Sequence, residues 1–266
     1  MTTLLASPST ARRWSASPAG PLRAESVVEL SLGTVHLVTL AWGRFDGFGT
    51  AAYWVAQARD GAYAQAESFG SSLAQEVCFC LLGGYGVTAE MNSAAYAAVL
   101  DADLIRTDPA PDASEIESVL RRPLSARGHR GLVRYRFPGQ RGMRVASALR
   151  LLANGPMPSE PVELRDALLS FTGIGPKTAS WIVRNHTGSS DVAIIDIHLR
   201  RAGLAAGFFR PEWRLPRDYA LFEAAFLAYA DAGGVPAGEL DLCIWDQVRR
   251  LGRAATGMLR PASRLD

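Results

Sequence analysis

Apolar residues along this 266-residue chain recur mostly at helical spacing. From Gly49 onward they return every three or four positions, which is typical of helices that bury one face. The exception is residues 26–42, SVVELSLGTVHLVTLAW, where β-branched residues on both sides of Gly33 predict a short hairpin. We therefore expect a mainly α fold with a small β-hairpin or sheet at residues 25–48, and no second convincing strand pair.

Capping residues mark the ends of the expected helices. Gly83 should end the first of them, and Thr88 should cap the next. Ser114 and Glu117 have the spacing of a capping box. Ser159 should cap the helix that follows the linker NGPMPSEP. Further helical patterns run over 145–152, 162–171, 218–231 and 239–251.

The two ends of the chain differ in composition from its middle. Residues 1–24 are rich in Ala, Ser and Pro, with three arginines and no acid. Such a composition is typical of a disordered tail and also of an organellar transit peptide, and we favour the tail. The last dozen residues should also be loose. We expect residues 25–266 to form a single helical fold.

Composition excludes several classes of protein. The chain is 48% hydrophobic and 20% charged, which is ordinary for a soluble enzyme. No apolar run approaches the roughly 20 residues that span a bilayer, and the N-terminus lacks the apolar segment of a secretory signal. Cys78, Cys80 and Cys243 are too few and too scattered for a disulfide framework or a metal site. We expect a cytoplasmic monomer with reduced thiols, no cofactor and no membrane contact.

The net charge of +2 hides an uneven distribution. Residues 121–150 contain nine arginines and no Asp or Glu, with Tyr135 and Phe137 among them. An acid-free basic run can be a solvated face, but the interleaved aromatic residues favour contact with nucleic acid. The candidate contacts from this run are Arg134, Arg141 and Arg144.

The stretch TGIGPKTASWIVRN, residues 172–185, contains the only lysine of the chain. The other 27 basic residues are all arginine, so a positive charge alone does not explain Lys177. Arginine stays protonated at usable pH, whereas a lysine amine can lose its proton and attack carbon. Lys177 should share one side of its helix with Trp181, opposite the buried Ile182. The pattern indicates a nucleophile.

Gly173 and Gly175 precede this lysine and predict a tight turn between two helices. We expect the turn to need positive φ, which glycine adopts readily. Pro176 suits the first turn of the second helix because its missing N–H would have no partner there. The exposed N–H groups of that helix start could bind a phosphate, with Thr172 and Thr178 beside it. The alternative is an ordinary helical turn whose glycines allow close packing.

The stretch LLSFTGIGPKTASWIVRN, followed by DVAIIDIHLRR, resembles the helix-hairpin-helix DNA glycosylase superfamily. The resemblance covers at least residues 160–201 and implies a helix-hairpin-helix over 161–186. In that superfamily a lysine two residues after the second glycine marks the members that also cleave the strand, and an aspartate follows about twenty residues on. Lys177 and Asp196 match both positions. Thr172 departs from a frequent proline and Ile195 from a frequent valine.

The resemblance implies roles for these two residues. Lys177 would displace the base from a nucleotide flipped out of the duplex, form a Schiff base and allow β-elimination. Asp196 would stabilise the positive charge that develops on the sugar. The alternative for Asp196 is that it only caps a helix. His198 would be structural or a phosphate contact.

The lesion is suggested by the C-terminal region. Relatives similar to endonuclease III often hold an iron–sulfur cluster with four cysteines, but only Cys243 follows Asp196 here. The chain therefore resembles the 8-oxoguanine DNA glycosylases, which lack the cluster, more than it resembles endonuclease III. Asp241 and Trp245 are one turn apart and could bind a flipped purine, as an aspartate and an aromatic residue do in the archaeal-type members. The alternative is a core tryptophan beside a solvent-facing carboxylate.

We expect a bifunctional 8-oxoguanine DNA glycosylase/AP lyase that acts on duplex DNA in base excision repair, in association with the nucleoid. Tyr85, in the loop GGYGV, would fill the gap left by the flipped nucleotide or else pack the loop. The resemblance also implies a monovalent cation on the hairpin carbonyls near Gly173 and Gly175. Two alternatives stay open: an enzyme for oxidised pyrimidines or another modified base, and a non-catalytic DNA-binding module.

Overall fold

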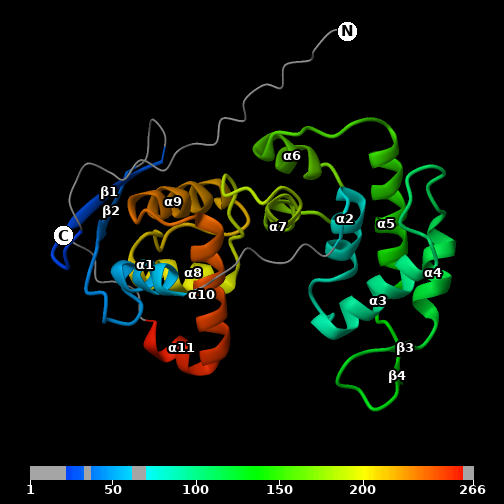
Figure 1. Ribbon diagram of the computed structural model, residues 1–266, viewed down its shortest axis with the longest axis horizontal. Coiled ribbons are helices and arrows are strands. Elements are labelled where there is room, and N and C mark those ends of the chain that lie inside the picture. The colour runs from blue at the N-terminus through cyan, green and yellow to red at the C-terminus, as the bar shows by residue number, and fades with distance from the viewer. Residues whose placement is uncertain (1–21, 33–36, 62–69, 260–266) are drawn as a thin grey trace, which may run out of the picture.

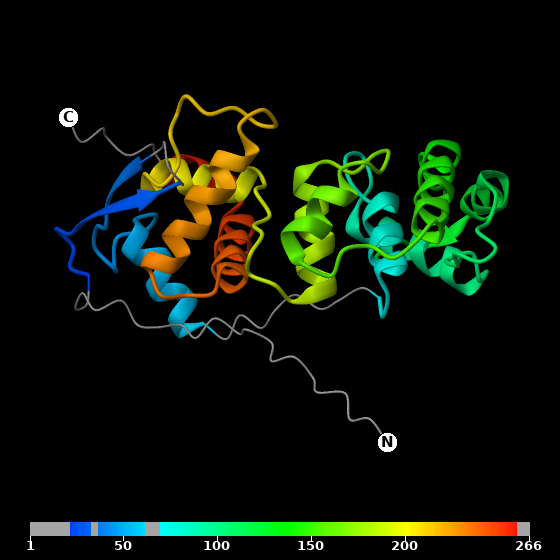
Figure 2. The same ribbon diagram turned by 90° about the horizontal axis from the view of Figure 1, so that it is seen from above.

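The computed structural model describes residues 22–32, 37–61 and 70–259. Within these ranges helices predominate, and the strands form two small antiparallel pairs. The predicted mainly α class with an N-terminal hairpin is confirmed. Figures 1 and 2 show two lobes that lie side by side and are joined through the segment after α7.

The first lobe combines the two ends of the described chain, and the second is formed by the middle. In Figure 1 the first lobe lies on the left and holds the dark and light blue, the orange and the red elements and the yellow α8, whereas the teal and green elements on the right form the second. The first lobe contains β1 (Val27–Ser31), β2 (Leu37–Ala41), α1 (Ala51–Asp60), α8 (Ile197–Ala206), α9 (Tyr219–Ala232), α10 (Ala237–Leu251) and α11 (Arg253–Met258). The second contains α2 (Leu73–Leu82), α3 (Ala89–Asp101), α4 (Ala113–Arg121), β3 (Leu124–Ser125), β4 (Leu132–Val133), α5 (Pro138–Ala153), α6 (Pro161–Leu168) and α7 (Pro176–Thr187).

Each lobe has its own hydrophobic core. The core of the first lobe is rich in aromatic residues, such as Trp54, Phe208 and Phe226. The core of the second is mostly aliphatic, with Val145 and Ile182 fully buried. The expectation of one fold over 25–266 stays a prediction, and the structure adds that its apolar side chains form two clusters. Residues 1–21, most of the expected tail, lie outside the described residues.

The N-terminal hairpin follows the alternation of its sequence. Val28 pairs with Leu40 and Leu30 with Val38 in an antiparallel register. Leu30, Val38 and Leu40 are buried, because alternate side chains of a strand point to the same face. That face packs toward α9 in the first lobe. Gly33, the expected turn residue, lies outside the described residues.

Two of the four predicted helix ends agree with the structure, and two do not. Gly83 follows α2, and the Thr88 hydroxyl accepts the Met91 N–H at the start of α3, as expected. The capping box of α4 is formed by Asp112 and Glu115, so the prediction of Ser114 and Glu117 is wrong by two residues. Asp112 is the better cap because its carboxylate is a stronger acceptor than a hydroxyl.

The start of α6 is also one residue later than predicted. Glu160 precedes the helix and its side chain accepts the Val162 N–H, so Ser159 is not the cap. Pro161 explains the shift, since proline favours the first position of a helix and restricts the residue before it to an extended conformation.

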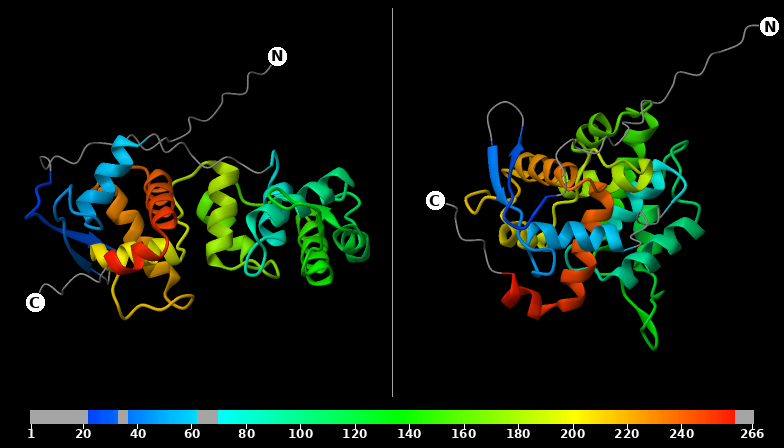
Figure 3. Two further views of the ribbon diagram at one scale, coloured as in Figure 1. Left: turned by 90° about the horizontal axis from the view of Figure 1, so that it is seen from below. Right: turned by 60° about the vertical axis from the view of Figure 1, so that its left-hand side comes forward.

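Two elements were not expected. Leu124–Ser125 and Leu132–Val133 form a second strand pair, which projects from the second lobe in the right-hand view of Figure 3. Two-residue strands are too short for an alternating pattern to be visible in sequence. The short helix α11, Arg253–Met258, falls in the region expected to be loose. Ala255 and Leu259 anchor it by packing into the core of the first lobe.

The described residues form neither a membrane-spanning helix nor a metal-binding cluster. No helix among them is long and apolar enough to cross a membrane. In the same residues no group of three or more His, Cys, Asp or Glu side chains could hold a metal ion. The three cysteines are buried, and none of them forms a disulfide within the described residues.

Candidate active site and nucleic-acid interface

The predicted helix-hairpin-helix is formed by α6, the turn at 169–175 and α7. Gly173 has φ +94°, in the left-handed region that favours glycine. A Cβ atom on Gly173 would lie 2.7 Å from Cδ of Arg144, so this position also needs glycine for space. Gly175 has an extended φ of −105°, so the expectation of positive φ is wrong for the second glycine. Gly175 instead leaves free space at the start of α7, because nothing lies within 4 Å of where its Cβ would be.

The start of α7 matches the expectation. Pro176 stands in the first turn, and the N-cap Gly175 contributes no side-chain hydrogen bond. The N–H groups of this turn therefore face outward as a potential anion site. Ile182 is buried while Lys177 is exposed, as the helical pattern predicts. The Lys177 amine lies 5.9 Å from the centre of the Trp181 ring, on the same side of the helix.

α2 runs antiparallel to α7 and ends beside this helix start. Glu76 pairs with Asn185 at one end of the two helices, and the Phe79 ring meets Trp181 in the middle. At the other end the charge of Lys177 reaches Cys80, where it opposes the rise in thiol pKa caused by burial. The loop after α2 thus emerges at the Lys177 end of the pair. At its tip Tyr85 is 97% exposed.

Side chains from residues 134–144 support this loop. Arg141 donates to the Leu81 carbonyl over 3.0 Å, and the Tyr135 hydroxyl donates to the Leu82 carbonyl. A Cβ on Gly86 would lie 3.2 Å from the Phe137 ring. The loop, the hairpin and the arginine-rich segment therefore gather at one end of the α2–α7 pair.

The three predicted arginine contacts differ in exposure. Arg134 is exposed, and Arg144 is half-buried with its stem against Gly173. Arg141 is only 8% exposed and binds the end of α2, which argues against the DNA contact predicted for it. Arg136 was not singled out, but it is exposed and stacks on Phe137 at 5.0 Å. Its position in the acid-free basic run of residues 121–150 could have identified Arg136 as a candidate DNA contact.

Asp196 begins α8 as predicted. Its Oδ1 accepts the backbone N–H groups of His198 and Leu199, each over 2.8 Å. The carboxylate therefore caps the helix and has a fixed orientation. The Nδ1 atom of His198 is buried and makes no hydrogen bond within the described structure.

Asp241 lies on α10, across from α7. It is 5% exposed and forms an ion pair with Arg184 of α7. Burial raises the pKa of Asp241 to about 7; Arg184 and Lys177 act in the opposite direction, and Asp196 adds to the rise. The charges of Lys177 and of Asp196 therefore both act on the Asp241 carboxylate, although the three residues are distant in sequence. The expectation of a solvent-facing carboxylate, the alternative for Asp241, is excluded by its burial.

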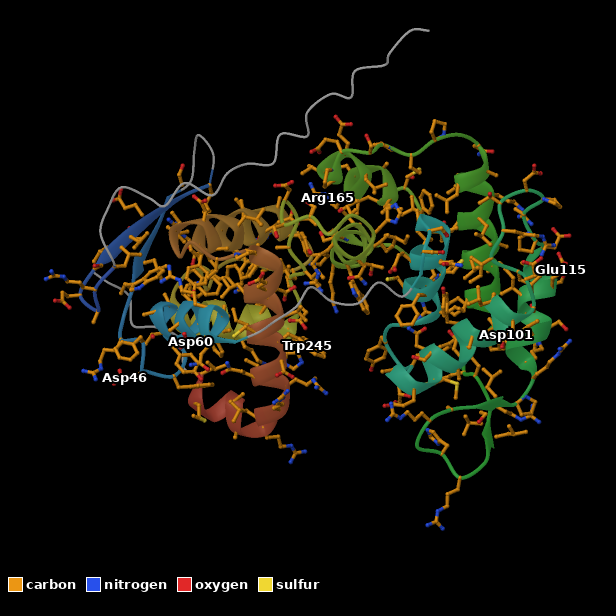
Figure 4. All side chains as sticks on the ribbon, in the orientation of Figure 1. Asp46, Asp60, Asp101, Glu115, Arg165 and Trp245 are labelled. Atoms are coloured by element: carbon orange, nitrogen blue, oxygen red, sulfur yellow. The ribbon has the colours of Figure 1, made fainter. Side chains whose placement is uncertain are left out.

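Trp245 stands one turn beyond Asp241 and is 37% exposed, so it is not a core tryptophan. Figure 4 shows it on the flank of α10 nearer to the second lobe. The Arg249 guanidinium lies 4.6 Å from its ring. Arg184 was missed by sequence reasoning. Its signal was its place seven residues after Lys177, which puts both on one face of α7.

The fold and this hairpin define the class of helix-hairpin-helix DNA glycosylases. The family model of 8-oxoguanine DNA glycosylase matches residues 57–235, more than half of the chain. The chain therefore belongs to the 8-oxoguanine DNA glycosylase family.

Three individual proteins are similar to this chain. An 8-oxoguanine DNA glycosylase/AP lyase of Metallosphaera sedula is 34% identical over 87 residues, which are 32% of this chain and 42% of the relative. The chain thus spans less than half the length of that relative. An 8-oxoguanine glycosylase/lyase of Methanocaldococcus jannaschii, solved with a 15mer DNA containing 8-oxoguanine, has 24% identity and a TM-score of 0.50 over 75% of this chain and 89% of that one. The 8-oxoguanine DNA glycosylase of Thermotoga maritima has 25% identity and a TM-score of 0.47 over 66% and 79%.

Proposed function

We propose that this protein is a bifunctional 8-oxoguanine DNA glycosylase/AP lyase that acts on duplex DNA. The observation that carries the proposal is the arrangement around the helix-hairpin-helix. Lys177 lies at the start of the helix whose Arg184 pairs with Asp241 of α10, and α10 packs on α8, which Asp196 begins. Membership of the family and the activity of the Metallosphaera sedula relative support it. A DNA substrate would place the protein on the nucleoid.

The proposed reaction begins with extrusion of the damaged nucleotide, at a cost of about a few kcal/mol. The neutral amine of Lys177 attacks C1′ of the sugar, and the bond from C1′ to the base breaks as the base leaves with its electron pair. Asp196 faces the positive charge that develops on the sugar. Ring opening then gives a Schiff base, and loss of a C2′ proton breaks the bond from C3′ to the leaving phosphate. A cation on the hairpin carbonyls stays a prediction, and this chemistry does not depend on it.

The proposed base pocket lies between α7 and α10. Trp245 offers an exposed indole on which a purine can stack. Arg184 engages Oδ2 of Asp241, and we assign Oδ1 to the N1–H and amino protons of the base. Arg184 would hold this carboxylate ionised and in place once the base excludes water.

Replacing Asp241 should test this pocket. We expect Asp241→Asn to slow release of 8-oxoguanine by about 10-fold or more, because the single oxygen of the amide cannot accept from the base and from Arg184 at once. Single-turnover excision from an 8-oxoguanine duplex measures this effect. Trapping on a preformed abasic site should be nearly unchanged, since no base is present. Asp231→Asn, which changes an exposed carboxylate of α9 away from Trp245, is the control. Equal excision rates for the wild type and Asp241→Asn would show that Asp241 does not bind the base.

The proposed DNA surface is formed at the Lys177 end of the α2–α7 pair. Phosphates would meet the N–H groups at the start of α7, and Tyr85 would fill the gap in the duplex. The other proposed contacts are Thr172, Gly173, Gly175, Thr178, His198, Arg134 and Arg144.

A charge variant should change the salt dependence of binding. Arg144→Gln keeps the stem that packs on Gly173 and removes the charge, so the slope of log K against log salt should fall by about 0.9 for one lost phosphate contact. Affinity for an undamaged duplex over a salt series measures this. Arg150→Gln is the control, because Arg150 lies on the same helix and pairs with Asp112 at 2.9 Å. Identical slopes for the two variants would exclude Arg144 as a contact.

The proposal as a whole is tested by borohydride reduction in the presence of lesion duplexes. The wild-type protein should form a covalent adduct with an 8-oxoguanine duplex. An adduct only with oxidised pyrimidines would support the same chemistry but assign a different lesion to the enzyme. Salt-sensitive binding without any adduct, on lesion or abasic duplexes, would contradict the proposed enzyme activity. The protein would then be a non-catalytic DNA-binding module.

A further inference from the structure

The segment that leads into Asp196 is buried but pairs with no strand of the described structure. Residues 192–195 are all buried. Two side chains of α9 supply the backbone hydrogen bonds that a neighbouring strand would otherwise give. Glu223 accepts the Ala193 N–H over 2.9 Å. The Tyr219 hydroxyl donates to the Ala193 carbonyl over 2.7 Å and accepts the Ile195 N–H over 3.2 Å.

The same carboxylate also holds the helix-hairpin-helix. Oε1 of Glu223 accepts the Ser180 hydroxyl of α7 over 3.2 Å. Oε2 accepts from Arg165 of α6, which Figure 4 shows near the junction of the two lobes. Glu223 itself is only 6% exposed. One buried group from the first lobe therefore contacts both helices of the hairpin motif and the segment before Asp196.

These hydrogen bonds connect helix α7, which bears Lys177, to the segment that leads into Asp196. Ser180 lies one turn after Lys177 on α7, and Ala193 lies three residues before Asp196. Glu223 Oε1 receives a hydrogen bond from both, so it fixes the distance between the helix of the amine and the segment of the carboxylate. Tyr219 is one turn from Glu223 on α9 and fixes the same segment at two further atoms.

Stability alone is a weak reason for a buried ion pair at this place. Replacing such a pair by apolar residues of similar volume is often neutral or stabilising, because removing two charges from water is costly. Geometry is a stronger reason. The reacting atoms must approach within about 3–3.5 Å, and a misplacement of about 1 Å can cost 100-fold in rate.

We propose that Glu223 and Tyr219 are positioning residues that set the geometry of Lys177 and Asp196 across the junction of the lobes. This inference rests on the proposed glycosylase function. Neither side chain touches the DNA, and both act through the backbone of 193–195 and through Ser180.

The test compares two matched tyrosines of α9. Tyr219 and Tyr229 are both buried, and each hydroxyl donates to a backbone carbonyl, that of Ala193 for Tyr219 and that of Ala51, over 2.6 Å, for Tyr229. Tyr219→Phe should lower the single-turnover rate constant for excision of 8-oxoguanine by about 10-fold or more, with unchanged affinity for the duplex. Tyr229→Phe should keep the wild-type rate constant, because its hydroxyl lies away from α7 and 193–195.

Rate constant and amplitude separate positioning from folding. A purely structural role would lower the fraction of active enzyme, seen as reaction amplitude, and leave the rate constant of the folded fraction unchanged. Glu223→Gln should also lower the rate constant by about 10-fold, since an amide cannot serve Arg165, Ser180 and Ala193 together. Wild-type rate constants in Tyr219→Phe and Glu223→Gln would overturn the inference. An inactive wild-type protein would instead overturn the proposed function.

Discussion

Lys177→Gln should abolish the borohydride-trapped adduct and lower base excision by at least about 10³-fold, because the nucleophile is gone. The fold should survive, since Lys177 is exposed on α7 and glutamine is nearly as good a helix former as lysine. Covalent trapping on an 8-oxoguanine duplex, together with the thermal unfolding midpoint, measures both effects.

The sharper variant is Lys177→Arg. It keeps the positive charge and adds donors, so a lysine that only contacts phosphate would be replaced without loss. A nucleophile would not, because the guanidinium cannot be deprotonated in a protein. We expect Lys177→Arg to bind DNA as the wild type does and to form no adduct. Trapping by either variant would assign the chemistry to another amine, such as the N-terminus.

Asp196→Asn should give the second largest effect, a decrease of about 10²- to 10³-fold in the rate of base release, from loss of the charge that faces the developing cation. Asparagine caps helices about as well as aspartate, so α8 should remain intact. Single-turnover excision of 8-oxoguanine measures the rate. The substitution separates catalysis from capping because it removes only the charge.

Asp196→Ala completes the comparison. It should lose both the charge and the acceptor for the His198 and Leu199 N–H groups, and the missing cap should cost about 1 kcal/mol of stability. If Asp196→Asn released the base at the wild-type rate while Asp196→Ala was merely less stable, Asp196 would be a structural cap and no more.

Local features of this protein were readable from the chain. Helix ends at Gly83 and Thr88, the outward position of Lys177 and the cap formed by Asp196 each depend on residues within about four positions. The errors are of the same local kind. Asp112 forms the cap expected of Ser114 because its carboxylate is the stronger acceptor, and Pro161 moves the cap expected of Ser159 to Glu160. Family resemblance added the pairing of Lys177 with Asp196.

Long-range contacts were decided only by the tertiary structure. Arg184 and Asp241 are 57 positions apart, and Ser180 and Glu223 are 43 apart. No periodicity or spacing links such positions, because their contact depends on how α9 and α10 pack against α7. The sequence by itself determined which side chains could do the chemistry. The packing of the two lobes decided which of them share a site, since a buried charge is stable only where a partner from another element reaches it.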